Sequence, residues 1–210
     1  KVFYKSNKLL EFENYTHLPE IIEINRFKEV KRIAFIGNVR HFELLKNLVL
    51  SLKDNQRFRL SIYGDGIFEQ KLKDYCSDHG INNINFHGSY DFNRIEDIYQ
   101  KVDIVWAAYP SKSFNVKYAI SNKFFEILAQ NKIGIFSENT ELGKYVYERN
   151  LGLVVNPYCL NSIQKALLSI EDENMCYNIL KQINLYKNKF DLSWSKNEQK
   201  LLNFYEKIEA

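Results

Sequence analysis

Short apolar runs alternate with amphipathic stretches along most of the chain after Lys31. The first run, from Arg32 to Gly37, is apolar after its first residue and ends in glycine. Residues 41–53 then place Leu44, Leu45, Leu48 and Leu52 at the spacing of one helix face. This pattern predicts a strand followed by a helix.

The same unit recurs through the rest of the chain. Further strands are predicted at 58–63, 83–87, 102–108, 133–137 and 152–156. Helices are predicted at 65–79, 91–100, 119–130 and 139–149, and over most of the remainder. Strands that alternate with helices pair in parallel through right-handed crossovers. The sequence therefore predicts an α/β fold with a Rossmann-like, doubly wound parallel sheet.

The two ends of the chain differ from this central pattern. Residues 1–30 are polar and irregular around Pro19, and they predict a linker or arm with one short strand near 21–24. Residues 31–190 form the predicted domain, and 191–210 predict an amphipathic helix. The chain opens at Lys1 rather than Met, which indicates either a piece cut from something longer or a processed start.

Composition narrows the class of protein. The chain is 45% hydrophobic and 26% charged, with a formal net charge of +3. This small excess disfavours a dedicated nucleic-acid protein but allows a local basic pocket for phosphate. The three cysteines lack metal-type spacing and are predicted to be buried small hydrophobes in a reducing cytoplasm. They are Cys76, Cys159 and Cys176.

Three consecutive predicted strands end in glycine, at Gly37, Gly64 and Gly88. Two interpretations stand for these glycines, namely plain turn chemistry and the rim of a ligand crevice. In a doubly wound sheet, that crevice lies beyond the carboxyl ends of the strands. Neither a Gly-x-Gly-x-x-Gly motif nor a P-loop is present.

Two groups near the strand ends could bind an anion. Arg40 follows Gly37 where a helix begins, so it is either a phosphate ligand or a solvated surface arginine. Lys123 and Glu126 lie three residues apart on a helix that Ser121 could cap. By themselves, these two residues favour a surface ion pair over a ligand site.

The segment 122–137 resembles the signature of GT-B glycosyltransferases of the glycogen-synthase-like, family 4 type, written Lys-x-x-Glu-x-x-Ala-x-Gly-x-Pro-Val-Ile-x-Ser. The resemblance covers about 31–171 and would make this chain the C-terminal, nucleotide-sugar-binding half of such an enzyme. Its other parts are Gly37 with a basic residue after it, 62–66, 84–88, 99–104 and 150–155.

The resemblance implies roles for individual residues. Gly37, Arg40 and Lys123 would hold the diphosphate, and Glu126 would hold the ribose. Gly88, Ser89 and Tyr90 would lie beside the base. Tyr118, Ser121 and Asn122 would lie near the donor sugar, in or after a long loop at 109–118. That loop either closes over the sugar or is a mobile surface loop.

This sequence departs from the family pattern at several positions. Tyr118 stands where a second glutamate is common, which weakens the prediction of sugar contacts. Asn131 replaces a glycine at a helix end, where asparagine is the next-best residue. Ile133 replaces a proline, and Lys46 is displaced from the usual first-loop lysine into the predicted helix.

The predicted function is transfer of a sugar from a UDP- or GDP-linked donor to a glycan or lipid-linked acceptor, in surface polysaccharide or capsule synthesis. The resemblance implies no essential metal or cofactor. It also implies a missing N-terminal acceptor domain on which 191–210 would pack, and without which the chain would be inactive. The location would be cytoplasmic, with peripheral contact at the inner face of the membrane through the missing domain. The alternatives are a nucleotide-sugar 2-epimerase of the same fold and a non-enzymatic flavodoxin-like domain.

Overall fold

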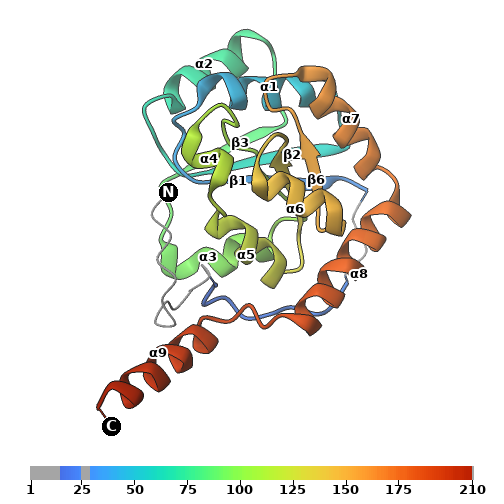
Figure 1. The fold of residues 1–210 in the computed structure, drawn as a ribbon. Coiled ribbons are helices and arrows are strands. Elements are labelled where there is room, and N and C mark those ends of the chain that lie inside the picture. The colour runs from blue at the N-terminus through green and yellow to red at the C-terminus, as the bar shows by residue number, and fades with distance from the viewer. Residues whose placement is uncertain (1–14, 25–28, 210) are drawn as a thin grey trace.

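The computed structural model describes residues 15–24 and 29–209 and contains a six-stranded parallel sheet in the order β3-β2-β1-β4-β5-β6 (Figure 1). The strands are β1 (Lys31–Ile36), β2 (Phe58–Tyr63), β3 (Ile84–Gly88), β4 (Ile104–Ala107), β5 (Ile133–Ser137) and β6 (Leu153–Val155). This is the Rossmann order, which confirms the predicted fold class. Flavodoxin-like domains have the order 2-1-3-4-5, so the structure does not fit that alternative.

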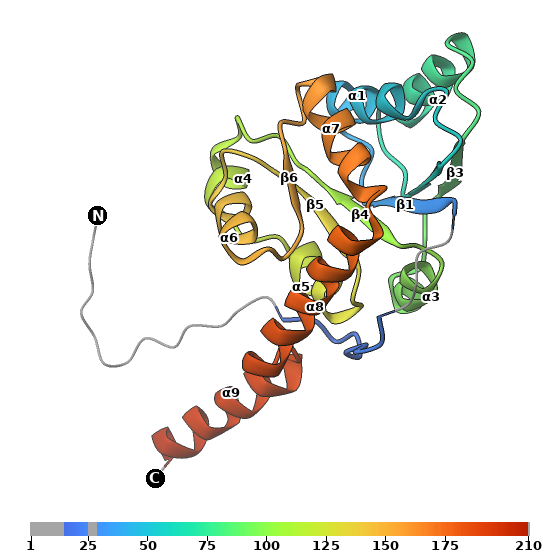
Figure 2. The same ribbon diagram turned by 90° about the vertical axis from the view of Figure 1, so that its right-hand side faces the viewer.

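Helices cover both faces of the sheet (Figures 1 and 2). One layer holds α1 (Phe42–Leu52), α2 (Glu69–Asp78) and α7 (Leu160–Ile170). The other holds α3 (Ile95–Gln100), α5 (Asn122–Ala129) and α6 (Glu141–Arg149). The chain reverses its direction of winding between β1 and β4, and this switch point is where a doubly wound sheet binds ligands.

The centre of the sheet is buried on both faces. Every residue of β4 and β5 is buried, as are residues Ile33–Ile36 of β1. Sandwiched parallel strands require such continuous apolar runs, because helices cover both of their faces. Trp106 and Phe136 are among the largest fully buried side chains.

One segment that was predicted as a loop contains a helix. The short helices η1 (Phe92–Arg94) and α4 (Phe114–Tyr118) precede α3 and α5. The segment 109–118, which was expected to be an open loop, therefore contains the five-residue helix α4. Ser121 caps α5 as expected, since its hydroxyl accepts a hydrogen bond from the Lys123 amide. Asn131 adopts the left-handed conformation at φ 50°, as its replacement of glycine predicted.

The arm packs against the domain through side chains that donate to its backbone. Pro19 O accepts from Gln130, and Ile21 O, Ile22 O and Glu23 O accept from Lys187, Asn184 and Asn131, at 2.5–2.8 Å. We call this set of contacts the arm clasp. The predicted strand near 21–24 is absent, because these carbonyls bond to side chains rather than to a neighbouring strand. Thr16 forms only an isolated bridge with Ser193.

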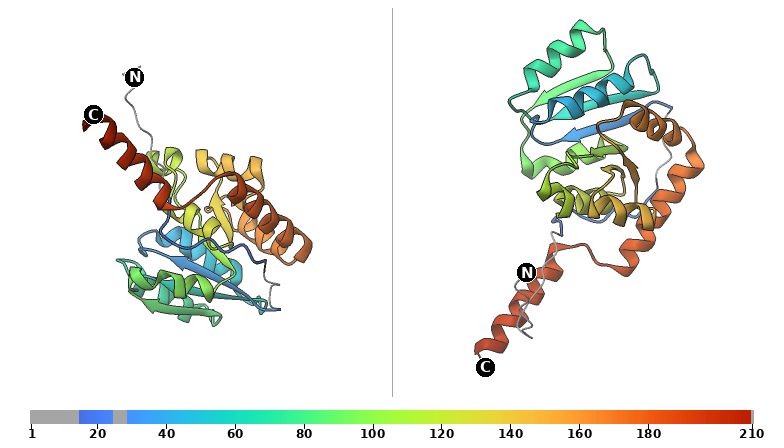
Figure 3. Two further views of the ribbon diagram at one scale, coloured as in Figure 1. Left: turned by 90° about the horizontal axis from the view of Figure 1, so that it is seen from below. Right: turned by 45° about the horizontal axis from the view of Figure 1, so that its top comes forward.

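The end of the chain is helical, as expected. α8 (Glu173–Lys189) packs against α5 and β5, and α9 (Trp194–Glu209) projects away from the domain (Figure 3). Leu201, Leu202 and Tyr205 on α9 are 39–56% exposed. Within the described residues, no helix combines the length and apolar character that a membrane crossing requires.

One prediction about the cysteines is wrong. Cys76 and Cys176 are buried, as expected, but Cys159 is exposed. Cys159 occupies the N-cap position of α7, outside the apolar face that this helix buries. Its position before the helix therefore leaves it at the surface.

Candidate functional site

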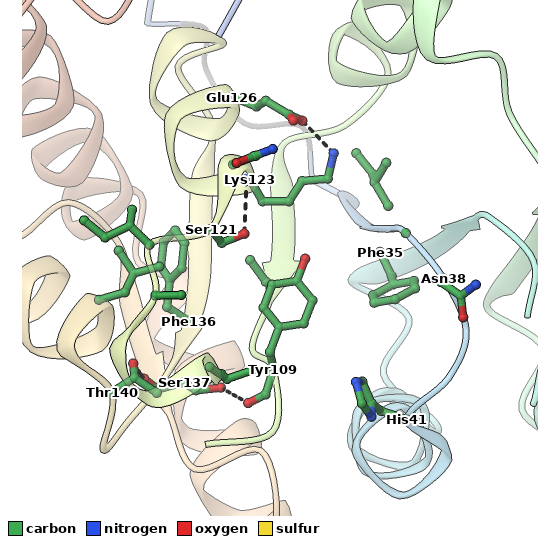
Figure 4. Close-up of a pocket in the computed structure, with 18 of the residues that line it drawn as sticks. Phe35, Asn38, His41, Tyr109, Ser121, Lys123, Glu126, Phe136, Ser137 and Thr140 are labelled. Carbon is green, nitrogen blue, oxygen red and sulfur yellow. Dashed lines mark hydrogen bonds and ion pairs between the residues drawn. The ribbon is translucent and has the colours of Figure 1, made fainter. Parts of the chain in front are cut away.

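A cavity of about 520 Å³ lies beyond the carboxyl ends of β1, β4 and β5. It separates the β1–α1 loop, which carries Asn38 and His41, from the wall formed by Tyr109, Phe136 and the start of α5 (Figure 4). Small-molecule sites are commonly of this volume and lie at this switch point of a doubly wound sheet. The cavity is therefore the candidate site.

The β1–α1 loop is held in place by the loop after β2. The Gly37 amide donates to Tyr63 O at 2.9 Å, and the Val39 amide donates to Asp65 O at 2.8 Å. Gly64 has φ +123°, and a Cβ on it would lie 2.0 Å from Gly37 O. Gly64 thus serves close packing between the two loops, whereas Gly37 lines the cavity itself.

Arg40 lines the cavity beside the first residues of α1. Its guanidinium is exposed and makes no ion pair or hydrogen bond with a described residue. Burial and the neighbouring Arg40 charge lower the pKa of His41. Helix N-termini and unpaired arginines both attract anions, so this corner of the cavity suits a phosphate group.

Lys123 and Glu126 line the opposite side of the same cavity. Lys123 Nζ lies 2.6 Å from Glu126 Oε2, so the ion pair expected from their spacing is present. Both side chains are largely buried, with 12% and 8% of their surface exposed. The two interpretations of this pair are compatible, because the ion pair faces the cavity (Figure 4).

Buried tyrosines support this wall. Tyr99 Oη donates to Glu126 Oε2 at 2.8 Å. Burial, together with the Glu126 charge, raises the pKa of Tyr99 well above the ordinary value. Burial raises the pKa of Tyr109 to about 12, although a hydrogen bond with Ser121 acts in the opposite direction. Both phenols are therefore neutral hydrogen-bonding groups at physiological pH.

The structure brings most of the predicted site residues together. Seven of them line the cavity, namely Gly37, Arg40, Tyr90, Ser121, Asn122, Lys123 and Glu126. Gly88 and Ser89 do not, and Ser89 Oγ donates to Asp65 at 2.7 Å instead. Tyr118 ends α4, is 52% exposed and packs its ring against Phe114, so it also lies outside the lining.

Sequence reasoning missed some of the residues that shape the site. Tyr99 received no role because it lies within an ordinary apolar face of a predicted helix. Thr140 lines the cavity and caps α6 by accepting from the Gly143 amide. A threonine three residues after a buried strand was the available signal for that cap.

Residues 15–24 and 29–209 contain no cluster of three or more His, Cys, Asp or Glu side chains arranged to hold a metal ion. The charged groups of the cavity are those of Arg40, Lys123 and Glu126, together with the titratable His41.

Solved structures share this fold at low sequence identity. The C-terminal domain of LpcC, a glycosyl transferase group 1 family protein from Francisella tularensis, matches with a TM-score of 0.61 at 20% identity. The match covers 76% of this chain and 85% of that domain. No curated protein sequence matches the chain.

Two further structures were solved with UDP. S. aureus TarM, in a complex with Fondaparinux, alpha-GlcNAc-glycerol and UDP, has a TM-score of 0.67 at 12% identity. Anabaena HepE, in complex with UDP and glucose, has a TM-score of 0.64 at 14% identity. The matches cover 96% and 84% of this chain. The chain spans only 40% and 48% of those two proteins.

The family model for glycosyl transferases group 1 matches residues 30–172. This match begins just before β1 and ends just before α8, so it includes every strand and every residue of the cavity lining. The chain therefore belongs to the glycosyl transferases group 1 family and has the fold of a GT-B C-terminal domain.

Proposed function

We propose that this chain binds the nucleotide sugar donor of a two-domain glycosyltransferase, and that a further domain binds the acceptor. The proposal is supported by the cavity at the switch point of the sheet and by the family match. TarM and HepE, which share the fold, were solved with UDP. Since this chain spans less than half of each, the acceptor site would lie outside the matched region.

The observation that carries the proposal is the arrangement of charge in the cavity. Arg40, whose guanidinium has no partner among the described residues, lies on one wall, and the Glu126 carboxylate lies on the other. A nucleoside diphosphate has the complementary groups, since its pyrophosphate is anionic and its ribose hydroxyls are donors. A single ligand of this class satisfies both walls.

The donor is placed accordingly. The diphosphate lies beside Gly37, Arg40 and the first amides of α1, with Lys123 facing it from α5. The ribose hydroxyls bond to Glu126, and the base extends toward Tyr90 and the neighbouring Gly88 and Ser89. The sugar then lies toward Ser121 and Asn122. Tyr118 has no part in this arrangement, because it is outside the lining.

The reaction separates a sugar from its diphosphate, so negative charge develops on the leaving group. Arg40 and the open amides of α1 stabilise that charge electrostatically, and Lys123 adds a second cation. In this proposal the side chains and the helix N-terminus neutralise the diphosphate without a metal ion. The residues that activate the acceptor belong to the other domain.

For the acceptor we propose a glycan or lipid-linked molecule, used in surface polysaccharide synthesis at the cytoplasmic side of the membrane. The glycan-type ligands solved with TarM support a glycan acceptor. Product analysis of the full-length enzyme with lipid-linked and free glycan acceptors tests this part. Transfer to neither class would contradict it.

Isothermal titration calorimetry of this chain with UDP and with GDP tests donor binding directly. We expect one of the two to bind at micromolar to millimolar concentration, with one ligand for each chain. The nucleoside without phosphates is the control, and it should bind far more weakly because it cannot reach Arg40. Absence of binding by both UDP and GDP at millimolar concentration would contradict the proposed function.

A further inference from the structure

The two carboxylate oxygens of Glu126 have different surroundings. Oε2 accepts hydrogen bonds from Lys123 Nζ at 2.6 Å and from Tyr99 Oη at 2.8 Å. Oε1 accepts none from any residue that the structure describes. Figure 4 shows the Glu126 carboxylate above the cavity with Lys123 beside it. Only one oxygen of this carboxylate is thus left for a ligand.

The position of Glu126 makes that oxygen available. The carboxylate belongs to the lining of the main cavity, and also to that of a second pocket beside α3 and the arm. Glu126 is only 6% exposed as a residue, so few directions of approach remain open to it. Its Oε1 is not one of the fully buried oxygens that lack a partner, so a donor on a ligand in the cavity can reach it.

Tyr99 has a hydroxyl that packing alone does not require. The residue is 0% exposed in the last turn of α3, where its ring fills space in the core. A phenylalanine would fill that space without bringing a polar group into an apolar region. The hydroxyl of Tyr99 makes its hydrogen bond to Glu126, across the contact between α3 and α5.

We propose that Tyr99 is a positioning residue for nucleotide recognition. With Lys123 it holds Oε2 of Glu126, so that Oε1 is presented to the 2′ and 3′ hydroxyls of the donor's ribose. Tyr99 thereby determines how strongly the site prefers ribonucleotides to nucleotides that lack these hydroxyls. The inference rests on the proposed function, because it assigns the ribose subsite of the same cavity.

A purely structural role for Tyr99 predicts something different. Loss of the hydroxyl would then weaken the packing of α3 on α5 and lower the affinity for all ligands of the cavity by the same factor. A positioning role lowers the affinity only for ligands that carry ribose hydroxyls. The ratio of two affinities separates these roles, whereas a single affinity does not.

The test compares UDP with 2′,3′-dideoxy-UDP by calorimetry, or the corresponding guanosine pair if GDP binds more tightly. We expect the unmodified chain to prefer the ribonucleotide by about tenfold or more, as hydrogen bonds to a charged group allow. Tyr99→Phe should reduce that preference by about threefold to tenfold. The affinity for the dideoxynucleotide should stay unchanged.

Two further variants make the test decisive. Tyr186→Phe removes a hydroxyl that bonds to Tyr145 at 2.9 Å, outside the cavity, so it is the matched control and should keep the full preference. Glu126→Asp withdraws the carboxylate by one methylene while keeping Tyr99, and it should lose the preference as well. This second variant carries the test if Tyr99→Phe fails to fold.

Each remaining outcome is decisive. A full ribonucleotide preference in Tyr99→Phe, or in Glu126→Asp if Tyr99→Phe does not fold, would overturn the inference and leave the proposed function intact. An unmodified chain that binds UDP and dideoxy-UDP equally would do the same. A chain that binds neither UDP nor GDP would overturn both.

Discussion

Polar side chains around α5 serve two opposite purposes at its two ends. At the arm clasp, Gln130 and three other side chains donate to backbone carbonyls of residues 19–23. At the cavity, the side chains of Arg40 and Asn122 have no hydrogen bond to a described residue, and Glu126 keeps one oxygen unused. At the clasp the side-chain donors bond to the arm, although the buried amide oxygens of Gln130, Asn131 and Asn184 have no partner among the described residues. At the cavity the side-chain donors themselves are left open.

This difference distinguishes a structural contact from a binding site. Buried polar groups are normally paired, because an unpaired one loses its hydrogen bonds to water. A region that leaves polar groups unpaired next to a cavity is therefore suited to a ligand. Residue type alone does not make the distinction, since Glu126 and Gln130 are both polar, both buried and only four residues apart.

The largest expected effect on the clasp comes from Gln130→Ala. The side chain is 0% exposed and its amide donates to Pro19 O at 2.7 Å. The substitution leaves a void and a carbonyl without a donor, which should lower the free energy of unfolding by about 2–4 kcal/mol. Denaturant unfolding measures this loss, and nucleotide affinity should not change.

Gln182→Ala is the matched control for that substitution. Gln182 lies on α8 and is exposed, so its loss should change the free energy of unfolding by less than about 0.5 kcal/mol. If both glutamine variants were equally stable, the clasp would contribute nothing to the fold, and the contrast between the two regions would disappear.

Arg40→Ala should have the opposite profile. Loss of a charge-assisted hydrogen bond to phosphate should weaken UDP or GDP binding by about tenfold to a hundredfold. Stability should change little, because Arg40 is exposed and its side chain has no partner among the described residues. Calorimetry and denaturant unfolding measure the two effects on the same sample.

The control for Arg40 is Arg94→Ala. Arg94 is exposed on η1, pairs with Asp97 at 2.9 Å and does not line the cavity. Arg94→Ala removes one positive charge, as Arg40→Ala does, but at a position outside the cavity. Equal loss of affinity in both variants would show that overall charge, rather than Arg40 itself, attracts the ligand.

A smaller effect concerns pH at the clasp. Burial lowers the pKa of Lys187 to about 8, whereas a lysine in the unfolded chain titrates near 10.5. Below pH 8 both states hold the proton, and the folded state bears the cost of a buried charge. Between pH 8 and 10.5 the unfolded state binds more protons, so this group's contribution to stability rises with pH.

Lys187→Met isolates that contribution. We compare the free energy of unfolding of the unmodified chain with that of the variant at each pH. Between pH 7.5 and 10.5, the unmodified chain should gain about 1 kcal/mol or more relative to the variant. Lys181→Met, an exposed change on the same helix, should show no such trend. A flat difference for Lys187→Met would mean that this lysine titrates normally.

The smallest effect is expected from Lys46→Ala. This lysine lies within α1, where it pairs with Glu43 at 2.7 Å and does not line the cavity. Surface pairs at this spacing contribute about 0.2–0.5 kcal/mol. Calorimetry should find the nucleotide affinity unchanged within about twofold, because an interaction of this energy changes an equilibrium constant by about that factor at most. A large loss would place Lys46 in the site after all.

The periodic pattern of the sequence was enough to predict the sheet. Alternating apolar runs and helices fix the class of fold, because each strand must be buried on both faces. The strand order at β1 and β4 places Arg40 and Lys123 on one cavity, as expected from their positions after a strand and on a helix. Those contacts follow from topology.

Other features depend on contacts between distant segments. Tyr99 and Glu126 are 27 residues apart, and nothing in either helix pattern indicates their hydrogen bond. The sequence likewise gives no sign of the contact between Gln130 and the arm, where Gln130 donates to Pro19 O, 111 residues earlier in the chain. Contacts of this kind are present in place of the strand that was predicted near 21–24. The hydrogen bond that the Ser89 hydroxyl donates to Asp65, 24 residues earlier, was likewise not predicted. Such pairings are set by packing rather than by local sequence.

Nuclear magnetic resonance tests the contrast between the two regions most directly. During a titration of this chain with UDP or GDP, backbone amide shifts should change at Gly37, Arg40 and Lys123. The amides of Gln130, Asn184 and Lys187 should keep their positions, because their side chains are already engaged by the arm. Shifts centred on the clasp, with none in the β1–α1 loop, would contradict the account.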